Sequence, residues 1–184
     1  DDPPGAHVES WVKTTLAAMP WLWLANQEQK SRAKSAPRPR VLVLGLDGGT
    51  VAAFLAAHLP EGSTLSCAET SRALVDLART HFGLAPAVPV STAGGSLVSQ
   101  VRDCAEAAYD VVLVGTRALA ATESAERPSL FANLRRVLSA GGLCAACAES
   151  KEAAAELARI ALDTVGAEKS QMWFDSMQIA EEDE

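Results

Sequence analysis

A glycine-rich turn is the first candidate for chemistry in this sequence. Gly45, Gly48 and Gly49 surround Asp47 directly after the apolar run of residues 41–44. Glycines let a backbone turn tightly and approach a ligand, and the N–H groups of a following helix favour polar or anionic groups there. Strand, glycine turn and helix in this order are typical of the nucleotide-binding corner of a doubly wound α/β sheet.

Two polar residues further along the chain are candidates for nucleoside contacts. Glu69 is expected at the end of the second strand, where a carboxylate can accept hydrogen bonds from both ribose hydroxyls of an adenine nucleoside. Thr92 or Ser91 is the polar contact expected after the third strand. Ser71 is suited to cap the next helix and needs no ligand to explain it.

These residues lie in a regular alternation of strands and helices that begins at residue 40. We expect strands at residues 40–45, 63–69, 87–91, 109–115, 142–148 and 170–179, and helices at 50–59, 71–82, 95–107, 128–139 and 151–165. Such alternation predicts an α/β fold with a doubly wound, mostly parallel sheet. We place this domain at residues 40–180, with an acidic tail at residues 181–184.

Residues 1–39 are expected to form a tryptophan-rich helix and a basic linker. Apolar spacing predicts a helix over residues 8–25 that is bent or interrupted at Pro20. The linker, residues 26–39, is either solvated or a docking segment for RNA, and its basic residues are Lys30, Arg32, Lys34 and Arg38. Three tryptophans, Trp11, Trp21 and Trp23, either anchor a partner protein or cover the sheet.

Composition narrows the function classes. A net charge of −7 argues against nucleic-acid binding through the whole surface and leaves only the basic linker for it. No transmembrane segment is expected, because the apolar residues 16–25 fall short of the ~20 that a bilayer requires. The four cysteines fall in or beside predicted core elements, which favours free thiols in a reducing, intracellular compartment. Cys144 and Cys147 should point to opposite faces of one strand and bind no metal.

The stretch of residues 40–84 resembles the spermidine synthase branch of the class I S-adenosylmethionine-dependent methyltransferase fold. The resemblance rests on the glycine turn, on Glu69 and on residues 77–84, and it continues through residues 109–114 and 134–143. It implies a Rossmann-like sheet, with S-adenosylmethionine bound by the residues Gly45, Asp47, Gly48, Gly49, Glu69 and Thr92. It also implies a C-terminal hairpin, for which this sequence offers a single strand, so we expect that hairpin to be truncated.

Several departures from the family pattern make the sequence look degenerate. Asp47 replaces the middle glycine of the usual Gly-x-Gly-x-Gly, and Ser71 and Arg72 stand where Glu-x-Asp-Pro would place Asp-Pro. The expected fourth strand is followed by residues 115–117, Gly-Thr-Arg, and not by the aspartate that serves the family as a base. Loss of a general base costs roughly 10²- to 10⁴-fold in rate.

We therefore expect a catalytically inactive domain without a cofactor, whose nucleoside site is vestigial or weak. Its role would be that of an accessory or structural subunit that binds protein subunits of a larger assembly. The alternative is an active S-adenosylmethionine-dependent methyltransferase that acts on a protein or a small amine. Because the sequence begins with Asp1, removal of a targeting segment is one explanation, which suggests a mitochondrion or another organelle, with the cytoplasm as the alternative.

Overall fold

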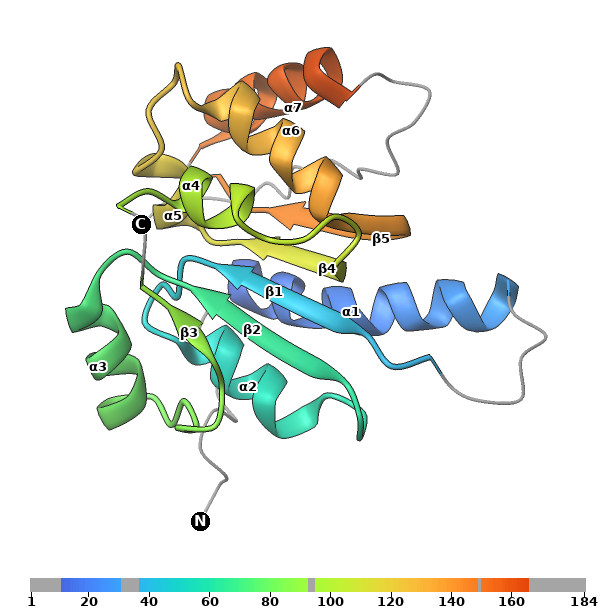
Figure 1. The fold of residues 1–184 in the computed structure, drawn as a ribbon, viewed down its shortest axis with the longest axis vertical. Coiled ribbons are helices and arrows are strands. Elements are labelled where there is room, and N and C mark those ends of the chain that lie inside the picture. The colour runs from blue at the N-terminus through green and yellow to red at the C-terminus, as the bar shows by residue number, and fades with distance from the viewer. Residues whose placement is uncertain (1–10, 31–36, 93–94, 149, 166–184) are drawn as a thin grey trace, which may run out of the picture.

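A computed structural model describes residues 11–30, 37–92, 95–148 and 150–165 of the chain. Its centre is a five-stranded, wholly parallel sheet in the order β3-β2-β1-β4-β5 (Figure 1). The strands are β1 (Arg40–Leu44), β2 (Thr64–Ala68), β3 (Val90–Ser91), β4 (Tyr109–Val114) and β5 (Leu138–Ala146). The α/β fold class and the parallel sheet predicted from the sequence are confirmed.

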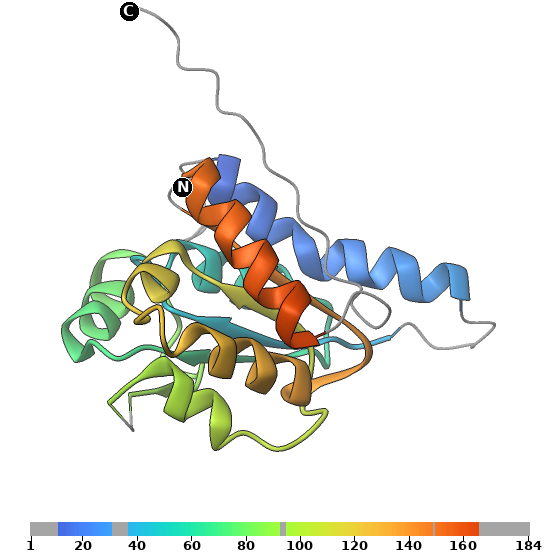
Figure 2. The same cartoon turned by 90° about the horizontal axis from the view of Figure 1, so that it is seen from above.

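Helices cover both faces of this sheet. The first face carries α1 (Trp11–Lys30), α2 (Thr50–His58) and α3 (Arg72–His81). The second carries α4 (Leu97–Arg102), α5 (Thr116–Ala120) and α6 (Arg127–Val137), with α7 (Lys151–Val165) packed against α6. Figure 2 shows α1 and α2 on one side of the sheet and α4 and α6 on the other.

The core follows from the alternation of side chains along the strands. Val41 and Val43 of β1 belong to the cluster beneath α1, α2 and α3, whereas Leu42 and Leu44 belong to the cluster beneath the other helices. Strands buried on both faces read as continuous apolar runs, which is why residues 41–44 carried a clear signal. Cys144 lies in the second cluster and Cys147 packs against the first, so the prediction that they face opposite sides is confirmed.

Of the predicted bend or interruption at Pro20, the interruption is wrong. α1 runs without interruption from Trp11 to Lys30, with Pro20 inside it and buried. A proline removes one helical hydrogen bond, and we attribute the survival of the helix to the apolar contacts of its buried face. The helix also extends five residues into the stretch that we expected to be linker.

Trp23 belongs to the core and not to an exposed cluster. It is 8% exposed, and its indole Nε1–H donates to the carbonyl oxygen of Gly141 at 3.1 Å. Trp21 is half-buried and lies edge-on against Phe54 of α2. Of the two roles that the sequence left open, Trp23 thus covers the sheet, and the side chain of Trp11 lies outside the described part of the structure.

Other boundaries shift for local reasons. α4 is shorter than expected because Ser96 caps it and Asp103 ends it. β5 starts at Leu138, directly after α6, so the glycine pair at 141–142 lies within an irregular stretch of the strand. α5 was not expected, and the strand predicted at residues 170–179 lies outside the described residues.

An ion pair fastens the amino edge of the sheet. Asp110 accepts hydrogen bonds from the guanidinium of Arg40 at 2.9 Å, from its backbone N–H at 3.0 Å and from the hydroxyl of Ser139 at 2.7 Å. Burial by itself would raise the pKa of Asp110, but these hydrogen bonds outweigh it and lower that pKa. The cluster lies at the opposite edge from the glycine turn and is structural.

No helix in the described part of the chain is long and apolar enough to cross a bilayer.

Candidate functional site

The glycine turn lies at the carboxyl edge of the sheet, between β1 and α2. Four of its residues have positive φ, with Gly45 at 78°, Asp47 at 46°, Gly48 at 90° and Gly49 at 85°. The Gly49 N–H donates to the carbonyl oxygen of Leu46 at 2.7 Å and closes the turn. The tight turn inferred from the sequence is present, and α2 begins directly after it.

Two of the three glycines are required by packing within the chain. A Cβ on Gly45 would come within 2.6 Å of the Ala118 Cβ on α5, and one on Gly49 within 2.5 Å of the Ala78 Cβ on α3. Gly48 differs, because the nearest atom to its added Cβ would be a ring carbon of Phe82 at 3.9 Å. Gly45 and Gly49 therefore allow helices to approach the turn, and this role needs no ligand.

Glu69 is buried at the end of β2 and bonds to the chain's own backbone. Its Oε2 accepts from the Leu46 N–H at 3.0 Å, and its Oε1 accepts from the Ser71 N–H at 2.9 Å. Oε1 also receives a longer bond, 3.4 Å, from the Thr70 hydroxyl. The carboxylate thus ties the glycine turn to the start of α3, and both oxygens are engaged without a ribose.

Asp47 crosses the sheet edge to reach the start of α5. Its Oδ1 accepts from the Arg117 N–H at 3.3 Å, and Oδ2 lies where a Cβ on Gly115 would stand. Burial raises the pKa of Asp47, although N–H groups of Arg117 and Thr116 and the Arg117 charge oppose the rise. The carboxylate therefore occupies the carboxyl end of β4, the position where the sequence itself offers no acid.

The sequence did not reveal that two residues, Gly115 and Cys147, interact with Asp47. Gly115 makes room for the carboxylate, and it was noted only as the place where an aspartate is absent. Cys147, after β5, has a pKa raised to about 11 by burial and by the Asp47 charge. Neither carries a local signal, because each interacts with a residue far away in the sequence.

Thr92 lies at the same edge but is exposed. It follows Ser91, whose carbonyl oxygen accepts the Glu69 N–H at 2.9 Å, so β3 ends beside the buried carboxylate. The structure thus brings together the turn, Glu69 and the end of β3, as the sequence predicted, while Trp21 and Trp23 pack elsewhere. Whether any of these residues binds a cofactor remains a prediction.

The amino end of α2 has the features of a ligand-facing helix. Gly49 is its N-cap and offers no side chain to the helix N–H groups. Thr50, the first helical residue, is buried, and its hydroxyl has no hydrogen-bond partner among the described residues. The free N–H groups at a helix start attract polar or anionic atoms.

Within the described residues, no group of three or more His, Cys, Asp or Glu side chains is placed to hold a metal ion.

Solved structures of similar fold include methyltransferases and a probable spermidine synthase. A precorrin-6y C5,15-methyltransferase from Geobacter metallireducens superposes with a TM-score of 0.60 at 13% identity, covering 89% of this chain and 76% of that one. A probable spermidine synthase from Corynebacterium glutamicum gives a TM-score of 0.54 at 22% identity, over 72% of this chain and 47% of that one. The present chain thus matches about half of the synthase's length.

A third structure, a TehB-like S-adenosylmethionine-dependent methyltransferase from Corynebacterium glutamicum, matches over 82% of this chain and 83% of its own, with a TM-score of 0.50 and 14% identity. No protein-family profile and no curated protein matches the sequence. The sheet order and these superpositions give the chain the Rossmann-like fold of class I methyltransferases.

Proposed function

We propose that this chain is a catalytically inactive, spermidine synthase- or methyltransferase-like domain that serves as an accessory subunit of a larger protein assembly. One observation carries the proposal. Both carboxylates at the carboxyl edge, Asp47 and Glu69, accept hydrogen bonds from the chain's own backbone N–H groups.

The resemblance to spermidine synthases implies an acceptor for the proton of the attacking amine at the end of β4. The residues there are Gly115, Thr116 and Arg117, none of which is a base at neutral pH. Asp47 fills part of that space, but it is held against the start of α5. What argues against Asp47 as the base is its engagement, because its Oδ1 accepts the Arg117 N–H, even though burial raises its pKa.

The glycines support the same proposal. Gly45 and Gly49 are accounted for by the approach of Ala118 and Ala78, so a family-like turn can persist in a chain that binds nothing there. A packing role for Gly45 and Gly49 explains why the glycine turn is present although the polar residues around it differ from the family pattern.

An active S-adenosylmethionine-dependent methyltransferase on a protein or small amine is the second candidate. It is favoured by the open amino end of α2, where no side chain caps the helix and the Thr50 hydroxyl is unpartnered among the described residues. In that case Gly48 and Glu69 would contact the cofactor, since Glu69 Oε2, which accepts one hydrogen bond from the Leu46 N–H, retains a lone pair that can accept a ribose hydroxyl.

Native purification tests the accessory role. The endogenous chain, isolated under gentle conditions, should elute with other proteins at a mass well above that of a monomer. We suggest a mitochondrial assembly as the first place to look. Elution of the endogenous chain as a free monomer, together with methyl transfer to any protein or amine by the purified chain, would contradict the proposal.

A further inference from the structure

The helix α7 has one face packed into the protein and one face exposed to solvent. Its inner face contributes Leu157, Ile160 and Ala161 to the core, and Glu156 pairs with Arg127 of α6 at 3.3 Å. The helix lies at the end of the molecule, beyond β5 (Figure 1). The packed face and the ion pair fix its orientation, so the outer face is presented at the surface in a defined way.

An exposed leucine lies on this outer face. Leu162 is 41% exposed, and the other large hydrophobic side chains exposed in the described residues are Leu22 of α1 and Leu77 of α3. Two small residues of α7 lie one to two turns before Leu162: Ala155 is exposed and Ala158 is half-buried. Small side chains at these positions leave room for a second helix to approach.

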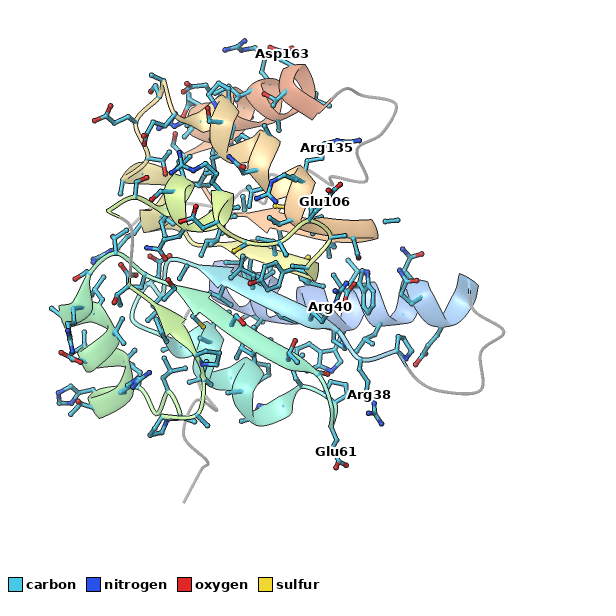
Figure 3. All side chains as sticks on the ribbon, in the orientation of Figure 1. Arg38, Arg40, Glu61, Glu106, Arg135 and Asp163 are labelled. Atoms are coloured by element: carbon cyan, nitrogen blue, oxygen red, sulfur yellow. The ribbon has the colours of Figure 1, made fainter. Side chains whose placement is uncertain are left out.

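Two opposite charges flank Leu162. Arg159 and Asp163 pair across one helical turn at 3.1 Å, and their side chains are 69% and 67% exposed. Figure 3 shows Asp163 at the outer surface of α7. Because water screens the pair, it contributes little within the chain and is available for other contacts. The two charges sum to zero in a chain whose net charge is −7, so this face does not repel an identical face.

We propose that α7 pairs with α7 of a second copy of this chain. Two antiparallel helices related by a two-fold axis beside Leu162 bring the two leucines together. The same axis places Arg159 of each copy beside Asp163 of the other. A two-fold interface must be self-complementary, and an apolar centre with one positive and one negative charge meets that requirement. A partner of uniform charge would leave one of the two charges opposed, which favours a second copy.

This inference goes beyond the proposed function, because it concerns a contact between two copies of the chain and not with other subunits. Sedimentation equilibrium of the full chain tests it. A contact of one helix from each copy is small, so we expect a reversible dimer at about 10–500 µM. Leu162→Asp should weaken dimerisation at least roughly ten-fold, because it buries a charge at the centre of the contact. Leu77→Asp on α3 is the matched control, since Leu77 is 39% exposed and should leave the dimer unchanged.

A charge exchange identifies the two-fold arrangement. Arg159→Asp and Asp163→Arg should each weaken self-association roughly ten-fold, because both ion pairs of the dimer become like-charged. An equimolar mixture of the two variants should regain the dimer, since each carries the charges that the other lacks. A wild type that stays monomeric throughout this range would overturn the proposal. So would a Leu162→Asp chain that dimerises like the wild type, or a mixture that associates no better than either variant alone.

Discussion

At the scale of single residues, Glu69 is a cross-link between two elements. Its two oxygens hold the N–H groups of Leu46 and Ser71 inside a buried environment. An amide in its place keeps one acceptor and turns an NH₂ group toward a backbone N–H. We therefore expect Glu69→Gln to lower the free energy of unfolding by about 1–3 kcal/mol without any ligand, measured by urea denaturation. Unchanged stability would mean that the carboxylate is kept for a ligand.

Asp47 gives a prediction that depends on pH. Burial raises its pKa above the usual 3.8, so its contribution to stability is fully present below the unfolded pKa and is lost as the pH rises through the folded pKa. Asp47→Asn should thus stabilise the chain at neutral pH by a few tenths of a kcal/mol, because the half-exposed group is screened by solvent.

Urea denaturation at about pH 7 and about pH 3 checks this sign, since the difference between wild type and variant should vanish at the acidic value. Asparagine is also a suitable residue for the positive φ of 46° at this position. A variant that is less stable at neutral pH would show that the ionised carboxylate's bond to the start of α5 outweighs its desolvation.

At the scale of elements, the close approach of α3 to the glycine turn is tested by adding a methyl group at Gly49 and, for comparison, at Gly48. Gly49→Ala combines an unfavourable φ of 85° with a 2.5 Å approach to the Ala78 Cβ, and should cost about 2–4 kcal/mol. Gly48→Ala at a φ of 90° meets nothing closer than 3.9 Å and should cost about 1–2 kcal/mol.

Adding Ala78→Gly to Gly49→Ala should recover part of the loss, and adding it to Gly48→Ala should not. Urea denaturation of the single and double variants measures this coupling. Equal costs at the two glycines would remove the packing explanation for the turn.

The attachment of α1 depends on Trp23. Trp23→Phe leaves the Gly141 carbonyl oxygen without its donor and should cost about 1–3 kcal/mol, and Trp23→Ser should cost about 3–5 kcal/mol. Trp21→Ser, at a half-buried site, is the comparison and should cost less. If both serine variants have the melting temperature of the wild type but no longer co-purify with the native assembly, the tryptophans form a partner interface.

The elements themselves follow largely from local sequence. α7 was predicted with its observed bounds, residues 151–165, and the apolar run of residues 41–44 identified β1. The site did not follow as fully, because its contacts are remote in sequence. Asp47 and Arg117 are 70 positions apart, and Trp23 and Gly141 are 118 apart. A single sequence carries no periodicity that reports such pairs, so the capping role of Asp47 and the burial of Trp23 emerged only from the structure.

At the scale of the whole molecule, the chain has a methyltransferase-like fold. Backbone N–H groups of the same chain donate hydrogen bonds to both carboxylates beside the glycine turn, Asp47 and Glu69. The fold alone does not determine function, since the same sheet carries many activities. In this chain the turn, Glu69 and Asp47 each have partners within the protein that account for their presence. This is the state expected of a domain retained for its shape and its surface.

Calorimetric titration of the intact chain with S-adenosylmethionine, and separately with its demethylated product, tests this central claim most directly. We predict no saturable heat with either compound up to about 1 mM, which corresponds to a binding free energy weaker than about −4 kcal/mol. A dissociation constant in the low micromolar range or tighter, abolished by Glu69→Ala in a variant that remains folded, would contradict the account and establish the corner as a working cofactor site.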